Sequence, residues 1–161
     1  MKNTDNPQKK KYWNQNEAYT NIKKYCAYQE RCHSEVRSKL LEHGIYGYLL
    51  EELIAKLITE NFLNEERFAI QFAGGKFRMK QWGKVKITHE LRLRKVSEYC
   101  IKSALAEIDS DHYLQSLSRI LDYKKTTLQG LSDTKMNARL TEFALSKGYS
   151  YEDIRKVLNP K

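Results

Sequence analysis

The residues of this chain best suited to bind another molecule are basic, and most of their charge lies in one segment. Residues 76–95 hold eight basic side chains and one acid, Glu90, so that +7 of the formal net charge of +9 falls in twenty of 161 residues. Such a concentration of cations predicts binding to a polyanion or to an acidic protein or membrane surface. Phe77 and Trp82 lie among these cations, where they could stack on nucleobases or anchor a protein partner. The alternative is a solvated face above core aromatics. The candidate binding residues are Lys76, Arg78, Lys80, Lys84, Lys86, Arg92, Arg94 and Lys95.

No pattern in the sequence predicts catalysis or a bound metal. The pair Cys32-His33 has no second pair at ligand spacing. Adjacent carboxylates such as Glu65-Glu66 point to different sides of a helix and cannot form an acid/base dyad there. Neither a glycine-rich phosphate loop nor a nucleophile motif is present. We therefore expect a protein that is not an enzyme and uses no metal or cofactor.

Helices must position the basic segment, because the sequence contains little that would interrupt them. Proline occurs only at Pro7 and Pro160, and the alternating pattern of β-strands is almost absent. The odd number of cysteines (Cys26, Cys32 and Cys100) predicts buried thiols used as small apolar residues in a reducing cytosol. No apolar segment approaches the ~18 residues that span a membrane, and the lysine-rich start is no secretory signal. We expect an all-α, cytoplasmic monomer.

A spacing of apolar residues recurs three times and predicts the architecture. The first copy is Val36, Leu40, Ile45, Leu50, Leu53, Ile54 and Leu57. It returns 51 residues later as Ile87, Leu91, Val96, Ile101, Ala104, Leu105 and Ile108, and 104 residues later as Leu140, Ala144, Tyr149, Ile154, Val157 and Leu158. With one further helix upstream, each copy describes three amphipathic helices. We predict a disordered basic tail over residues 1–17, then tandem three-helix repeats over residues 18–61, 62–109 and 110–161, forming an elongated, curved helical array.

The connections between helices carry their own signals. Gly44 and Gly148 occupy one template position, directly after a helix, where a left-handed residue ends it at low cost. Lys95 occupies this position in the middle repeat. Either the turn there has a different geometry, or the lysine is present for its charge. The predicted caps are Ser97 and Ser150 for the last helices of repeats two and three, and Asn64 and Ser110 for their first helices. Gly74-Gly75 predicts the end or a bend of the helix that leads into the basic segment.

These residues resemble the RecX family, the regulators of the RecA recombinase. The resemblance rests on "LNEERFA" (63–69), "GKVKITHEL" (83–91) and "IKSAL" (101–105), with a related phrase in "RCHSEVRSKLLEHG" (31–44). It spans residues 19–158 and is strongest in the middle repeat. Glu65 replaces the usual aspartate and Lys95 the usual glycine, and repeat three lacks a close copy of the acidic helix motif. The last departure leaves open whether repeat three shares in binding.

The resemblance implies a protein that binds the RecA filament on DNA and commonly inhibits strand exchange and the linked ATPase and coprotease activities. Its partners would be the RecA filament and DNA, single- or double-stranded and without sequence preference. Two other interpretations stay open. One is a helix-turn-helix transcription factor, which three-helix units and basic helices permit. The other is an architectural scaffold whose charge is incidental.

Overall fold

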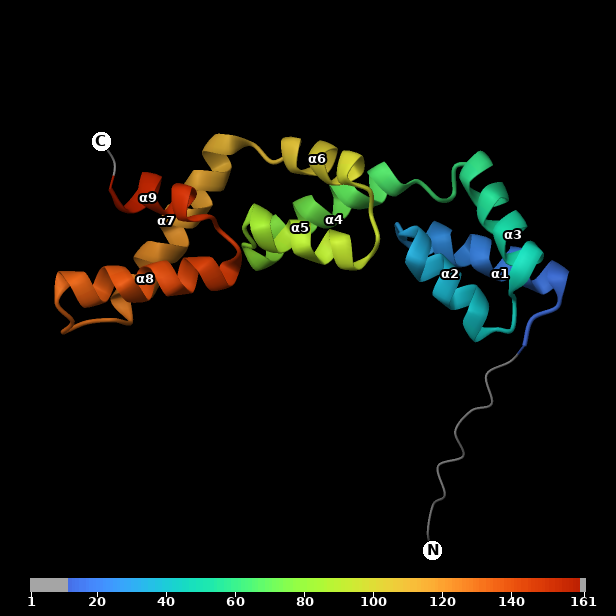
Figure 1. The fold of residues 1–161 in the computed structure, drawn as a ribbon, viewed down its shortest axis with the longest axis horizontal. Coiled ribbons are helices and arrows are strands. Elements are labelled where there is room, and N and C mark those ends of the chain that lie inside the picture. The colour runs from blue at the N-terminus through green and yellow to red at the C-terminus, as the bar shows by residue number, and fades with distance from the viewer. Residues whose placement is uncertain (1–11, 160–161) are drawn as a thin grey trace, which may run out of the picture. The chain divides into compact units, whose positions relative to one another are not determined.

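The computed structural model describes residues 12–159, and over that range the chain forms nine α-helices and no strand. They follow one another as three sets of three (Figure 1). The sets are α1 (Gln15–Tyr28), α2 (His33–Glu42) and α3 (Gly47–Thr59); α4 (Glu65–Lys80), α5 (Lys84–Leu93) and α6 (Glu98–Ala106); and α7 (Ser110–Thr126), α8 (Asp133–Lys147) and α9 (Tyr151–Leu158). The predicted all-helical fold of three-helix repeats is therefore confirmed.

The apolar template marks the buried side of each repeat. In repeat one all seven template residues are buried, and Ile22 of α1 and Leu63 join them in one core. In repeats two and three the template residues are buried too, except Leu105, Val157 and Leu158, which are half-buried. Removing such side chains from water is the main source of stability in so small a unit. The same spacing buries one face of each three-helix unit, which explains why the sequence keeps it in all three copies.

The turn between the second and third helix has the same geometry in every repeat. One backbone hydrogen bond of 3.0–3.1 Å closes each turn. The donor N–H and acceptor carbonyl belong to Ile45 and Leu40 in repeat one, Val96 and Leu91 in repeat two, and Tyr149 and Ala144 in repeat three. The residue before each of these donors is left-handed: Gly44 at φ +79°, Lys95 at +59° and Gly148 at +93°. The middle turn therefore does not differ from the others, although a lysine occupies it.

Replacing Lys95 with glycine should stabilise the chain, because a left-handed conformation is strained for a lysine and free of strain for glycine. The greater freedom of glycine in the unfolded chain offsets part of the gain, so we expect roughly 0.5–1 kcal/mol. Urea unfolding of Lys95→Gly measures it. Lys95→Ala removes the same charge and keeps the strained backbone, so an equal gain in that variant would contradict this explanation.

The disordered tail predicted for residues 1–17 extends too far, because the first helix begins within it. The Asn14 side chain accepts the N–H of Glu17 and caps α1, which begins at Gln15, before the predicted boundary at residues 17 and 18. Trp13 donates its N–H to the His43 carbonyl (3.1 Å) and stacks on the His43 ring with 3.8 Å between centroids. The sequence signal for this earlier helix start is a capping box, in which the Glu17 side chain also accepts the Asn14 N–H (3.1 Å). Residues 1–11 lie outside the described range.

The predicted caps of α6 and α9 are confirmed, whereas the predicted cap of α7 is displaced by one residue. Ser97 and Ser150 each accept an N–H from the first turn of α6 and α9. Asp109, one residue before the predicted Ser110, caps α7 by accepting the N–H of His112 (2.9 Å). Gly74-Gly75 does not end the helix, since α4 continues to Lys80. Gly74 instead leaves room for the Arg78 guanidinium, which folds back over it.

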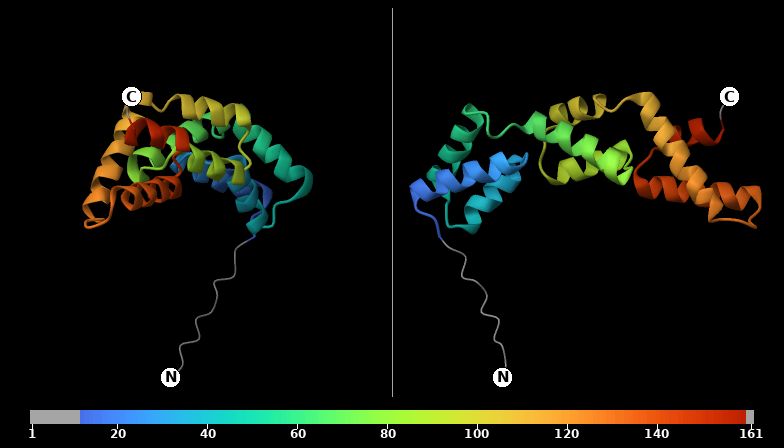
Figure 2. Two further views of the ribbon diagram at one scale, coloured as in Figure 1. Left: turned by 60° about the vertical axis from the view of Figure 1, so that its left-hand side comes forward. Right: turned by 180° about the vertical axis from the view of Figure 1, so that it is seen from behind.

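The second and third repeats form one compact unit, beginning at Glu66, and meet at the start of α5. Gly83 precedes α5 and has no side chain with which to cap it. The first amides of α5 find their acceptors in repeat three: Gly83 N–H bonds to the Lys147 carbonyl (2.8 Å), Val85 N–H to the Gly148 carbonyl (3.0 Å) and Lys84 N–H to Tyr113 Oη (2.9 Å). Figures 1 and 2 show the end of α8 beside the start of α5. Because buried amides require partners, this contact holds the two repeats together.

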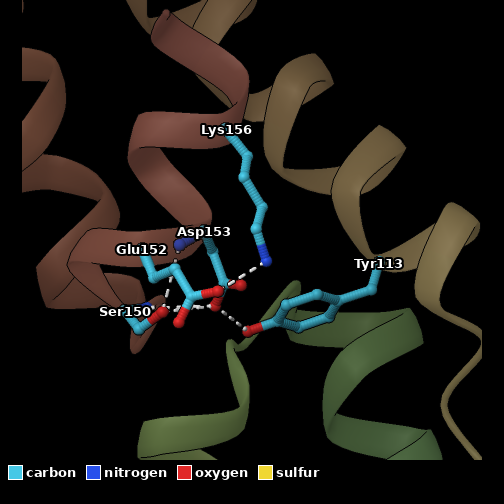
Figure 3. A network of polar contacts seen from close by, with 5 residues as sticks. All are labelled: Tyr113, Ser150, Glu152, Asp153 and Lys156. Atoms are coloured by element: carbon cyan, nitrogen blue, oxygen red, sulfur yellow. Dashed lines mark hydrogen bonds and ion pairs between the residues drawn. The ribbon is translucent and has the colours of Figure 1, made fainter. Parts of the chain in front are cut away.

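Tyr113 connects this junction to α9. Its hydroxyl accepts the Lys84 N–H and lies 3.4 Å from Asp153 Oδ2, which also accepts the Ser150 hydroxyl (2.7 Å) (Figure 3). Glu152 pairs with Lys156 beside them (2.8 Å). Burial is the main reason that the pKa of Tyr113 is raised far above its usual value. The phenol therefore stays protonated, so that it can donate to Asp153 while it accepts from Lys84.

The Tyr113→Phe variant should lose about 1–3 kcal/mol of stability, because the Lys84 N–H would remain at the junction without its acceptor. The aromatic ring is kept, so packing changes little. Urea unfolding gives the loss. Tyr123→Phe on the same helix is the matched control, since Tyr123 is 75% exposed and its variant should unfold like the unaltered chain. Equal stability of the two variants would show that the hydroxyl contributes nothing at the junction.

Candidate functional site

Four of the eight candidate cations lie against aromatic rings, and three of these rest on Phe72 of α4 or on Trp82 in the loop between α4 and α5. The Arg94 guanidinium is 4.7 Å from the Phe72 centroid, and Lys76 Nζ is 5.3 Å from the same ring. Lys76 Nζ is also 5.1 Å from the Trp82 centroid, and Lys86 Nζ is 4.8 Å from it. The order is therefore Arg94, Phe72, Lys76, Trp82 and Lys86, which we call the cation–aromatic ladder. Lys84 is the remaining one of the four. It lies apart from the ladder, at the junction between repeats, with Nζ 5.0 Å from the Tyr113 centroid.

The local structure explains why these groups meet. Phe72 and Lys76 are one helical turn apart on α4 and so share a side of it. Gln81 ends α4 in a left-handed conformation (φ +54°), and the Trp82 N–H then donates to the Lys76 carbonyl (3.3 Å). This places the indole next to Lys76. Lys86 and Arg94 reach the two rings from the first and last turns of α5.

The rings hold the lysines in place and leave their charge available. Over residues 12–159, neither Lys76 nor Lys86 forms an ion pair with a carboxylate. The ring face attracts an ammonium group by about 0.5–1 kcal/mol at an exposed site, without neutralising it. Each ammonium has three N–H donors, and the one recorded hydrogen bond among those of Lys86 goes to the Ser146 carbonyl (3.4 Å). Arg94 differs, because Glu90 binds it at 2.7 Å and the same contact lowers the pKa of Glu90.

The remaining candidates lie elsewhere on repeat two. Lys80 is exposed, one turn beyond Lys76 on the same side of α4. Arg78 lies on the opposite side, where it borders a groove of about 550 Å³ between α4, α6 and α7. Arg92 forms two hydrogen bonds with Glu98, at 2.6 and 3.0 Å, and Lys95 is exposed at the turn before α6. The structure therefore brings together Lys76, Lys80, Lys86 and Arg94, with Lys84 at the junction, and separates Arg78, Arg92 and Lys95 from them.

Sequence reasoning missed two of the rings that organise these cations. Trp82 was expected among the lysines and is there, but Phe77 instead packs on Tyr113, with 5.8 Å between centroids. Phe72 and Tyr113 hold cations and were not considered. The four-residue spacing from Phe72 to Lys76 could have revealed the first, whereas Tyr113 comes from another repeat.

The cysteines and the carboxylates do not form a metal site in the described part of the chain. Cys26, Cys32 and Cys100 are buried thiols, as expected, and burial raises the pKa of the Cys26 thiol to about 11. Such a thiol is protonated and unreactive at neutral pH. Among residues 12–159 no cluster of three or more His, Cys, Asp or Glu side chains could hold a metal ion. None of the helices there is long and apolar enough to cross a membrane.

The fold and this surface define a class, an all-helical three-helix repeat protein that presents a line of cations beside a junction between repeats. Sequence models of RecX match at two places: its second three-helix domain at residues 64–105 and its third at residues 111–158. Together they cover more than half of the chain. The chain belongs to the RecX family.

Similar proteins agree with this assignment. A regulatory protein RecX of Clostridium tetani is 33% identical over 127 residues, covering 78% of this chain and 58% of that protein. One from Bacillus cereus is 25% identical over 141 residues, covering 88% and 52%. The chain thus spans about half the length of the curated relatives it matches. The crystal structure of RecX from Lactobacillus salivarius, at 20% identity, superposes with a TM-score of 0.84 over 89% of this chain and 94% of that one, and shows the shared fold.

Proposed function

We propose that this chain binds RecA recombinase filaments on DNA and lowers their strand-exchange, ATPase and coprotease activity in recombination and DNA repair. Membership of a family of regulatory proteins supports a regulatory role. The filament on DNA is a negatively charged polymer, and the charge distribution of this chain suits such a partner.

The observation that carries the proposal is the cation–aromatic ladder. A lysine held over a ring loses less freedom on binding than a lysine that moves freely in water, so the positive potential is pre-organised. Lys76 and Lys86 lie over the Trp82 ring, and Lys80 adds a cation from the same side of α4 as Lys76. We assign Lys76, Lys80, Lys84 and Lys86 to the contact with phosphate groups or with an acidic face of the filament.

A direct test measures ATP hydrolysis by a RecA recombinase on single-stranded DNA while this chain is titrated in. We expect hydrolysis to fall as the chain is added, and the chain to sediment with filaments but not with free recombinase. No change in hydrolysis together with no co-sedimentation would reject the proposal. If hydrolysis rose and the chain sedimented with filaments, the filament would be retained as the partner, and the effect would be stimulation and not inhibition.

The transcription-factor interpretation is less well supported by the positions of the cations. A helix-turn-helix protein reads the major groove with the helix that follows the turn. In repeat two that helix is α6, whereas the ladder lies on α4, α5 and the loop between them. Protection of one defined DNA sequence in the absence of recombinase would favour this alternative. An architectural scaffold would bind no nucleic acid at moderate salt.

A further inference from the structure

A second group of cations around an aromatic ring lies in repeat three. Lys124 Nζ from α7 is 5.4 Å from the Phe143 centroid, and Lys147 Nζ, one turn after Phe143 on α8, is 5.8 Å from it. Phe143 is half-buried, like Phe72 and Trp82. In the part of the chain that the structure describes, neither lysine has a carboxylate partner. This group therefore resembles the part of the ladder formed by Lys76, Trp82 and Lys86, with two ammonium groups held by one ring.

The two groups meet at the junction between the repeats. Lys86, the last member of the ladder, reaches across to the Ser146 carbonyl, and Lys147 is the next residue. The backbone bonds from Gly83 to Lys147 and from Val85 to Gly148 keep these segments in contact. The order of groups continues from Phe72, Lys76, Trp82 and Lys86 into Lys147, Phe143 and Lys124.

A single strand of nucleic acid fits this order of groups better than an acidic protein face does. Proteins that bind single strands without sequence preference combine a row of cations along the backbone with aromatic rings for the bases. In the ladder and in the repeat-three group, a ring lies between two cations, and the two repeats are held together at the junction. An acidic protein face would use only the cations of this row, whereas a single strand can also place its bases against the half-buried rings.

We propose that one single strand of nucleic acid is bound across the junction, with its phosphates on Lys76 and Lys86 of repeat two and on Lys147 and Lys124 of repeat three. The assignment of repeat two rests on the proposed function, and the part played by repeat three is the new element. Repeat three then acts as a binding domain and not only as a support for α5.

The experiment measures binding of a fluorescein-labelled oligo(dT) of about 20 nucleotides by fluorescence anisotropy at several salt concentrations. The test variant carries Lys124→Gln and Lys147→Gln. Its control carries Lys125→Gln and Lys135→Gln, two exposed lysines of α7 and α8 outside both groups, so that the net charge is the same. A third variant, Lys76→Gln with Lys86→Gln, reports on repeat two.

Loss of two single-strand phosphate contacts should lower the salt slope by about 1.4, which corresponds to roughly 25-fold weaker binding at 0.1 M salt. The control should stay within about twofold of the unaltered chain. Equal losses in test and control variants would overturn the proposal, as would a test variant that binds normally while the repeat-two variant does not. Equal competition by polyglutamate would overturn the choice of nucleic acid.

The recombinase assay keeps the two proposals apart. If the chain lowers ATP hydrolysis but does not bind the oligonucleotide, the proposal of a strand across the junction is wrong and the proposed function is retained. If the chain binds the oligonucleotide through both repeats but has no effect on recombinase, the proposed strand site is retained and the proposed function is refuted.

Discussion

Lys76→Glu together with Lys86→Glu is expected to abolish the effect of this chain on recombinase ATP hydrolysis. Both lysines lie over the Trp82 ring, and neither is neutralised by a carboxylate in the described range. The variant removes two phosphate contacts and places two negative charges against the same polyanion. Each lost contact weakens binding roughly fivefold at 0.1 M salt, and repulsion between like charges adds to this. We expect at least about hundredfold weaker binding to the filament.

The matched control for this prediction is Lys125→Glu with Lys135→Glu, which reverses the same amount of charge at exposed positions outside the ladder. Its effect on hydrolysis should be small, since long-range electrostatics are screened beyond about 8–10 Å at physiological salt. Circular dichroism melting of both variants excludes unfolding as the cause. If a folded ladder variant inhibited as well as the unaltered chain did, the assigned site would be wrong.

Gly148→Ala is expected to destabilise the compact unit of repeats two and three more than Gly130→Ala or Gly83→Ala does. A β-carbon at Gly148 would overlap Lys86, whose backbone nitrogen would be 2.6 Å away. The residue is also left-handed, at φ +93°. The α5 backbone cannot move aside without breaking the bonds of Gly83 and Val85 to Lys147 and Gly148. We expect a loss of about 3 kcal/mol, from overpacking and backbone strain together.

Two glycine variants separate these causes. Gly130→Ala has a left-handed backbone (φ +84°) and open space around it, so it should cost only the roughly 1 kcal/mol of backbone strain. Gly83→Ala has an ordinary backbone and overlaps the Gly148 carbonyl, so it should cost what the overlap alone costs, about 1–3 kcal/mol. Urea unfolding ranks the three. If Gly148→Ala cost no more than Gly130→Ala, the close approach of the repeats would not exist in solution.

The helical repeats could be predicted from the sequence because they depend on local interactions. The spacing of Val36, Leu40 and Ile45 returns in each copy, and the same residues close the same turn in the structure. A serine at a helix start and a left-handed residue at a helix end act within four residues of themselves. The errors were local too: Asn14 and Asp109 cap helices where the analysis chose other starts.

The site could be predicted only in part. The sequence determined by itself that the chain is helical, that it repeats, and that its charge is concentrated in residues 76–95. Tertiary structure alone decided which cations act together. It put Lys76 and Lys86 on one indole and paired Arg92 with Glu98. It also brought Lys86 to Ser146, sixty residues away. Local patterns set where helices begin and end, but which side chains meet depends on how two helices and two repeats pack, and that is a property of the whole core.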